Sequence, residues 1–256
     1  MNPAPVPSTS VGFVEDYAAA VERFAVSVGW SDLRNPVSAC PGWSVRDLVV
    51  HLGNVHAWAA TIVETGQRAF ETNDEPHANR PRAVSEWYFA KAEDLYQVLR
   101  QTPADKPCWN FVVGTGVAEF WQRRQLHETT IHQVDLDVAS GRSTEVSAHV
   151  AADGIDEVLT VMLPRMAKRG YPSVLTVPLQ LVASDTGDSW AVLPDPGGSP
   201  GVVRELSPAE GREDRVVAPA DVLYRALWHR RFDERRLRIA GDEPRVRAFL
   251  GSPLTP

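Results

Sequence analysis

The first 140 residues repeat apolar side chains at intervals of three and four positions, which is the pattern of amphipathic helices. Stretches rich in proline, glycine and polar residues interrupt this pattern and predict loops at 72–81 and 103–116. The intervening segments predict four helices, at 14–28, 44–66, 84–99 and 117–139. Helices of this number and length predict a bundle with an up-and-down path or a crossover variant.

The start of the second helix is sharply defined. Ser44 is a favourable N-cap residue, and Asp47 stands three positions later, where its carboxylate can bond back to the N-cap backbone. A long helix is expected to follow this capping box as far as about residue 66.

The pattern of apolar residues changes in the second half of the chain. Alternating apolar residues at 175–182 predict a strand, in which Pro178 favours a sheet edge or a bulge. The other expected elements are strands at 190–193, 202–206 and 237–239, a hairpin connection at 194–201, and helices at 151–169, 219–230 and 245–250. The sequence therefore predicts an α+β protein of two domains, a helical bundle at 1–144 and a smaller α+β domain at 145–256.

Composition and charge narrow the class of protein. The net charge of -7 argues against binding to nucleic acid or to an anionic membrane surface. No run of about 18 apolar residues predicts a transmembrane helix, and the first residues lack the features of a secretory signal. A cytoplasmic location is expected. Cys40 and Cys108 are not arranged as C-x-x-C, so both are expected to be packing residues.

The fourth predicted helix carries titratable side chains on one face. Glu128 and His132 are four positions apart, so they lie one turn apart and close enough to chelate one ion. Asp135 falls on the same face, beside apolar residues, where charges need partners or a metal. His127 lies five positions from His132, about 140° around the helix, and is expected to be a structural or surface residue.

The second predicted helix supplies a further candidate ligand. His51 shares an apolar ridge with Val55, Trp58 and Ile62, and therefore points at or near the core. Together with Glu128 and His132 it would make a set of two histidines and a carboxylate. Such a set suits zinc best and leaves a coordination position open for water or substrate.

Asp135 would then be an acceptor that fixes the tautomer of a ligand histidine. The spacing alone leaves a competing interpretation open and slightly favoured, a buried ion pair between histidine and glutamate without a metal.

Two segments resemble a known family. Residues 40–53 read CPGWSVRDLVVHLG, and residues 121–135 read WQRRQLHETTIHQVD. They resemble the motifs P-G-W-[ST]-V-R-D-L-x-x-H-L and W-x-R-R-x-x-H-E-x-x-x-H-x-x-D of mycothiol-dependent maleylpyruvate isomerases, which belong to the DinB-like group of four-helix metalloenzymes. The resemblance implies a DinB-like bundle in which His51, Glu128 and His132 bind a divalent metal, usually zinc.

The C-terminal part shows a third resemblance. Residues 218–231 read APADVLYRALWHRR, which is similar to the A-x-D-L-L-x-x-L-W-G-R-R stretch of the family's second domain. That domain is α+β and related in shape to sterol carrier proteins. The resemblance implies a catalytic arginine, here Arg230, that would bind a substrate carboxylate. A surface position for Arg230 is the alternative, and His229 replaces the usual glycine.

The resemblance implies an enzyme that activates mycothiol, the low-molecular-weight thiol of actinobacteria, at a metal. The thiol would add to an electrophilic small molecule, and the enzyme would be a cis-trans isomerase of a maleylpyruvate-like acid or a thiol S-transferase. Two other classes stay open, namely a non-catalytic module that binds a metal or small molecule, and a metal-dependent hydrolase. The sequence indicates neither the electrophile nor the oligomeric state.

Overall fold

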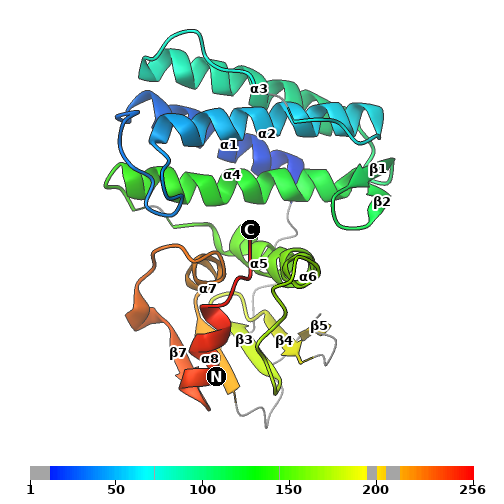
Figure 1. The fold of residues 1–256 in the computed structure, drawn as a ribbon, viewed down its shortest axis with the longest axis vertical. Coiled ribbons are helices and arrows are strands. Elements are labelled where there is room, and N and C mark those ends of the chain that lie inside the picture. The colour runs from blue at the N-terminus through cyan, green and yellow to red at the C-terminus, as the bar shows by residue number, and fades with distance from the viewer. Residues whose placement is uncertain (1–11, 72, 144, 195–200, 206–213) are drawn as a thin grey trace, which may run out of the picture. The chain divides into compact units, whose positions relative to one another are not determined.

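The structure is a computed structural model that describes residues 12–71, 73–143, 145–194, 201–205 and 214–256. These residues divide into two compact units, one spanning Gly12–Thr144 and the other Glu145–Pro256. The first unit is mainly helical and the second combines helices with a sheet, which confirms the predicted fold class (Figure 1). The change of unit coincides with the change in sequence pattern.

Four long helices build the first unit. They are α1 (Phe13–Gly29), α2 (Val45–Thr65), α3 (Pro81–Gln101) and α4 (Glu119–Ala139), each within three residues of its predicted bounds. The closely packed pairs are α1 with α3 and α4, and α2 with α3 and α4. Helices α1 and α2, which are consecutive in the chain, therefore lie diagonally across the bundle, as do α3 and α4 (Figure 1). The bundle is the crossover variant.

The capping box of α2 forms as predicted. The Asp47 amide donates to Ser44 Oγ at 3.3 Å, and the Ser44 amide donates to Asp47 Oδ2 at 2.8 Å. Two of the amides that a helix start leaves unsatisfied are thereby paired. At the other end Gly66 adopts a φ of 72°, a left-handed conformation that glycine takes without steric cost, and its amide bonds to the Ile62 carbonyl.

The predicted loop at 103–116 is only partly a loop. It contains a hairpin of β1 (Pro107–Asn110) and β2 (Gly114–Val117), paired antiparallel. The turn is held by Asn110, whose Oδ1 accepts from the amides of Val112 and Val113. Strands of four residues are too short to show the alternation that signals a strand, and β2 contains two glycines, which is why the pattern predicted a loop.

The second unit contains a five-stranded sheet in the order β5-β4-β3-β6-β7. The strands are β3 (Leu179–Ala183), β4 (Ser189–Leu193), β5 (Gly201–Glu205), β6 (Asp214–Ala218) and β7 (Arg238–Ala240). Strands β3 and β6 pair in parallel, and the other neighbours are antiparallel. Helix α7 (Ala220–Leu227) follows β6, and a 3₁₀ turn (Glu234–Arg236) and α8 (Glu243–Leu250) flank β7.

Two strand predictions were wrong. Strand β3 is central rather than at an edge, because Pro178 lies just before the strand and takes no place in its hydrogen-bond ladder. Strand β6 was not predicted, since its five residues mix two charged side chains with two valines. Of the predicted hairpin connection at 194–201, residues 195–200 lie outside the described residues.

The predicted helix at 151–169 is interrupted. It consists of α5 (Ala148–Glu157), a π-helical turn (Val158–Met162) and α6 (Leu163–Lys168). Pro164 stands at the start of α6, and a proline within a helix removes one donor and crowds the preceding turn. The wider π turn just before it accommodates that disruption.

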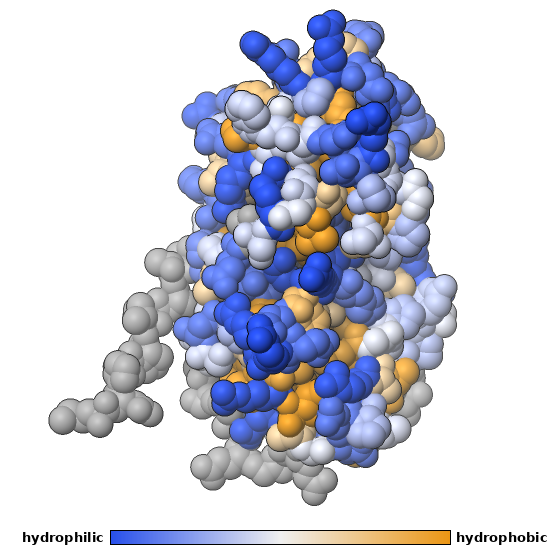
Figure 2. Space-filling model, turned by 90° about the vertical axis from the view of Figure 1, so that its left-hand side faces the viewer, coloured by the Kyte–Doolittle hydropathy of each residue, from blue (hydrophilic) through white to orange (hydrophobic). Residues whose placement is uncertain are grey.

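On the face drawn in Figure 2, apolar side chains occur in scattered patches among hydrophilic ones, as in most folded proteins. Among the described helices, none is both long and apolar enough to cross a membrane.

Close packing between α2 and α3 gives a test of the bundle. A Cβ added at Gly53 would clash with the Trp87 ring. We expect Gly53→Ala to lower the free energy of unfolding by about 1–3 kcal/mol, because overpacking outweighs the gain of about 1 kcal/mol from helix propensity. Denaturant unfolding measures the change. In a Trp87→Leu background the same substitution should become neutral or stabilising, and an equal loss in both backgrounds would contradict this packing.

Candidate metal centre

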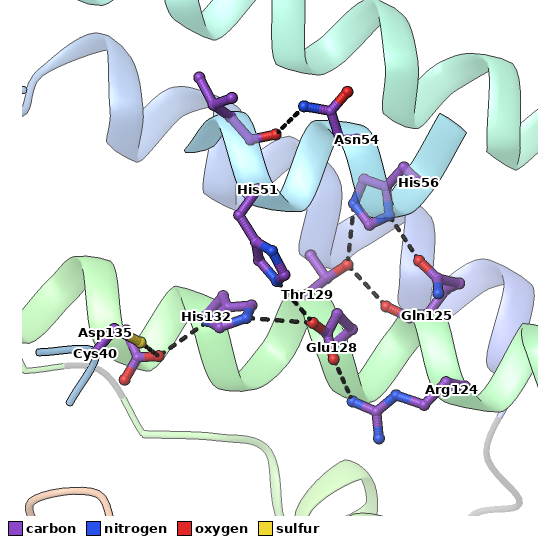
Figure 3. A network of polar contacts seen from close by, with 11 residues as sticks. Cys40, His51, Asn54, His56, Arg124, Gln125, Glu128, Thr129, His132 and Asp135 are labelled. Atoms are coloured by element: carbon purple, nitrogen blue, oxygen red, sulfur yellow. Dashed lines mark hydrogen bonds and ion pairs between the residues drawn. The ribbon is translucent and has the colours of Figure 1, made fainter. Parts of the chain in front are cut away.

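Two helices of the bundle bring the three predicted ligands together. His51 projects from α2, and Glu128 and His132 project from α4, one helical turn apart (Figure 3). One donor atom from each of the three side chains lies within 4.8 Å of the others. Packing of α2 against α4 therefore builds the cluster, and the capping box that starts α2 sets where that helix begins.

The distances within the cluster suit a shared ion. Glu128 Oε1 lies 3.3 Å from His51 Nε2 and 3.3 Å from His132 Nε2. Both distances exceed the usual N–H···O range of about 2.7–3.2 Å. Donors at two corners of a tetrahedron around zinc, each about 2.0–2.1 Å from the ion, are roughly 3.3 Å apart. The donor types and their spacing thus fit a divalent ion.

Asp135 contacts the ring nitrogen of His132 that faces away from Glu128. His132 Nδ1 donates to Asp135 Oδ2 at 2.9 Å, so Nε2 is the nitrogen that faces Glu128 and His51. A carboxylate that accepts from the outer nitrogen of a histidine fixes the ring and raises its basicity. Cys40 Sγ donates to the same oxygen at 3.9 Å, which adds a thiol that the sequence had indicated only for packing.

Charge is concentrated around Glu128. Burial by itself would raise the pKa of Glu128, but hydrogen bonds with His132 and His51 and the nearby Arg124 hold that pKa well below its ordinary value. Burial lowers the pKa of His132, yet its bonds to Asp135 and Glu128 outweigh burial and raise the pKa to about 9. Without an ion His132 is therefore charged, and metal binding at Nε2 would displace a proton.

His51 is the most accessible member of the cluster. The exposed fraction of its side chain is 34%, against 19% for Glu128 and 7% for His132. The indole of Trp43 packs on one side of the His51 ring, with centroids 4.8 Å apart. Access from the His51 side would leave room for a fourth ligand, as catalytic rather than structural zinc sites require.

The structure offers a second group that could hold an ion, made of Cys40, His132 and Asp135. It shares only His132 with the first group, and one histidine cannot serve both groups through the same nitrogen. His132 Nδ1 already bonds to Asp135 at 2.9 Å. We therefore take His51, Glu128 and His132 as the primary set.

The segment that carries the three candidate ligands matches a known protein family. Residues 14–137 match the family model described as the mycothiol maleylpyruvate isomerase N-terminal domain. The helical bundle belongs to this domain family. The match confirms the family resemblance that the two helical motifs carried. No match was found among curated proteins.

The fold of most of the chain also resembles solved structures. A crystal structure of a histidine-to-alanine mutant of the mycothiol-dependent maleylpyruvate isomerase superposes with a TM-score of 0.58 and 14% identity, over 89% of this chain and 91% of that chain. A second crystal structure of the mycothiol-dependent maleylpyruvate isomerase gives 0.55 and 15%, over 84% and 86%. At these identities the likeness establishes the fold.

Arg230 lies in the second unit, which follows the helical bundle in the chain. Its Nη1 donates to the Trp228 carbonyl at 2.8 Å, and its guanidinium carbon lies 5.9 Å from the centre of the Trp228 ring. The half-buried side chain lines a cavity of about 300 Å³ together with His229 and Arg247. Glu234 lines the same cavity and lies 3.7 Å from Arg247, so its carboxylate offsets one of the two guanidinium charges. These contacts do not test the substrate-binding role predicted for Arg230, which stays a proposal.

The backbone conformation of His229 explains why the family motif has glycine at this position. Its φ of 56° is left-handed, and among the described residues no other non-glycine residue has a positive φ. His229 Nε2 donates to the Leu250 carbonyl at 3.0 Å, at the end of α8, which helps to hold this conformation.

Two other histidines of helices α2 and α4 lie outside the cluster. His127 is completely buried, so the structural alternative predicted for it holds and the surface alternative was wrong. His56 is also buried, where its Nδ1 donates to Gln125 Oε1 at 2.8 Å and its Nε2 accepts from Tyr88 at 3.3 Å.

The sequence reasoning missed Arg124, which donates to Glu128 Oε2 at 2.8 Å. The signal was present, since Arg124 stands four positions before Glu128 on the same helix face.

The buried His56 predicts how stability depends on pH. Burial lowers the pKa of His56 to about 4, although the bond to Gln125 and the charge of Glu128 oppose the shift. His56 is therefore neutral in the folded state, and its contribution to stability is present above pH 6.5 and lost as the pH falls towards 4.

We expect the loss of unfolding free energy between pH 7 and pH 5 to be smaller in His56→Gln than in the unmodified protein, by about 2 kcal/mol. Urea unfolding of metal-free protein at both pH values measures it. Parallel losses in the two proteins would contradict a neutral, buried His56.

Asp135 gives a test of the metal centre. We expect Asp135→Asn to weaken zinc binding about 10- to 100-fold, because the charge that supports His132 is lost. Competition with a chromophoric chelator measures the affinity. Asp137→Asn is the matched control, since Asp137 pairs with Arg142 and not with a ligand. Equal zinc affinity in Asp135→Asn and the control would exclude the assigned role.

Proposed function

We propose that the protein is a metal-dependent enzyme that activates mycothiol for addition to a small electrophilic substrate. The observation that carries the proposal is the convergence of His51, Glu128 and His132 at one point, with spacings of 3.3 Å. The membership of the bundle in the mycothiol maleylpyruvate isomerase N-terminal family supports the identity of the thiol.

The three side chains would hold a divalent ion, and zinc fits the imidazole and carboxylate donors best. When bound, the ion supplies positive charge that lowers the pKa of a thiol from its usual value of about 8.5. Asp135 keeps the His132 ring oriented with Nε2 towards the site. The partly exposed His51 leaves the approach to the open position accessible.

Arg230 would bind the carboxylate of the substrate through its guanidinium fork. In the isomerase form of the reaction, addition of the thiol to a conjugated double bond gives a single bond that can rotate. Elimination then restores the thiol and yields the other geometric isomer. In the S-transferase form the substrate keeps the sulfur. A location in the cytoplasm and a maleylpyruvate-like acid as substrate belong to the same proposal.

Cobalt substitution tests the proposal. We expect the cobalt(II) protein to develop a sulfur-to-cobalt charge-transfer band that saturates as mycothiol is added, because thiolate would fill the open position. His132→Ala should lose the band together with stoichiometric cobalt binding. His127→Ala, which changes a buried histidine outside the cluster, is the matched control and should keep both.

Other outcomes of the cobalt experiment decide between the classes of function that the sequence left open. Stoichiometric cobalt without a thiol band would contradict thiol activation and favour a metal-dependent hydrolase or a binding module. Failure to bind cobalt at all would contradict the metal centre itself.

A further inference from the structure

The two oxygens of Glu128 have different partners. Oε1 faces the two ligand imidazoles at 3.3 Å from each, whereas Oε2 accepts a hydrogen bond from Arg124 Nη2 at 2.8 Å (Figure 3). One oxygen of the carboxylate therefore faces the candidate ion position, and the other is bonded to a guanidinium group.

Arg124 is built into the helix that carries two of the ligands. It stands one turn before Glu128 on α4, and only 4% of its side chain is exposed. A charge-assisted bond of this length is strong, and removal from water strengthens it further. Arg124 therefore fixes which oxygen of Glu128 turns towards the imidazoles.

We propose that Arg124 is a positioning residue that restricts Glu128 to one-oxygen coordination and draws an anion to the open coordination position. The inference rests on the proposed metal centre and concerns how that centre selects its exogenous ligand. Two consequences of the Arg124 bond lead to it, one geometric and one electrostatic.

The geometric consequence concerns coordination number. A carboxylate can bind an ion through one oxygen or through both. Because Oε2 is engaged by Arg124, an ion held here would receive one oxygen from Glu128 and one nitrogen from each histidine. Three protein donors leave a tetrahedral ion with one free position, which is the arrangement that an incoming ligand needs.

The electrostatic consequence concerns the charge that an incoming ligand meets. A divalent ion with one carboxylate and two neutral imidazoles carries a net charge of about +1. The Asp135 carboxylate beside His132 would cancel that charge, and the Arg124 guanidinium, only 4% exposed and one helical turn from Glu128, restores a net charge of about +1. Anionic ligands such as a thiolate are therefore favoured over neutral water.

A purely structural role for Arg124 makes a different prediction. If Arg124 only neutralised the Glu128 charge, its loss would weaken metal binding without changing the choice of exogenous ligand. If it positions Glu128, its loss frees Oε2 to join the ion, so the metal stays bound while the coordination number rises and anion affinity falls.

The experiment compares cobalt(II) forms of the unmodified protein, Arg124→Gln, Arg124→Lys and Arg123→Gln. Azide serves as a simple anionic probe and mycothiol as the thiol. The visible cobalt bands report coordination number, because four-coordinate cobalt absorbs more intensely than five- or six-coordinate cobalt. Arg123→Gln is the matched control, since it removes the same charge about 100° further round the helix.

We expect Arg124→Gln to bind cobalt stoichiometrically, to absorb more weakly, and to raise the dissociation constant for azide about 10- to 100-fold. Arg124→Lys, which keeps the charge and one donor, should restore azide binding to within a few-fold of the unmodified protein. The Arg123→Gln spectrum and azide affinity should be unchanged.

Unchanged cobalt bands and azide affinity in Arg124→Gln would overturn the inference. Loss of cobalt in both Arg124 variants would also overturn it, in favour of a structural role. The azide arm is independent of the thiol. If the unmodified protein binds azide but not mycothiol, the proposed function fails while the role of Arg124 is still decided by the azide measurement.

Discussion

A largely buried carboxylate needs positive partners, and Glu128 meets this requirement at the centre of the cluster in the helical unit. Two imidazoles approach one of its oxygens and a guanidinium approaches the other, so that hydrogen bonds outweigh burial and keep the side chain ionised. Three cationic or metal-binding groups around one carboxylate are costly to assemble without a ligand. A divalent ion at Oε1 would replace the weak 3.3 Å contacts with coordination bonds.

The scaffold explains why these groups meet. Because α1 lies diagonally opposite α2, and α3 diagonally opposite α4, α2 packs directly against α4 and sets His51 opposite Glu128. The capping box at Ser44 fixes the start of α2, two turns before His51. Asp135 lies near the C-terminal end of α4 and holds the His132 ring. The ligands are therefore carried by helices that pack against each other, which limits the cost of ordering the ligands.

Sequence pattern predicted the features that depend on local spacing and missed those that depend on tertiary context. The four-residue interval between Glu128 and His132 placed both on one face, and the ridge containing His51 placed it near the core. The spacing could not decide between a metal and an ion pair, because that choice depends on distances across two helices. Arg124 was overlooked because an arginine beside a glutamate usually signals a surface pair. The hairpin at 107–117 is too short for periodicity to reveal, and strand β6 was missed because it mixes two charged residues with two valines.

The central claim is that His51, Glu128 and His132 together hold a divalent ion. X-ray absorption at the zinc edge of the zinc-loaded protein, without added thiol, tests it most directly. The account predicts one zinc per chain with a shell of nitrogen and oxygen at about 2.0–2.1 Å, including two imidazoles, and no sulfur. A sulfur neighbour at about 2.3 Å would instead place zinc at Cys40, and a shell with fewer than two imidazoles would contradict the ligand set.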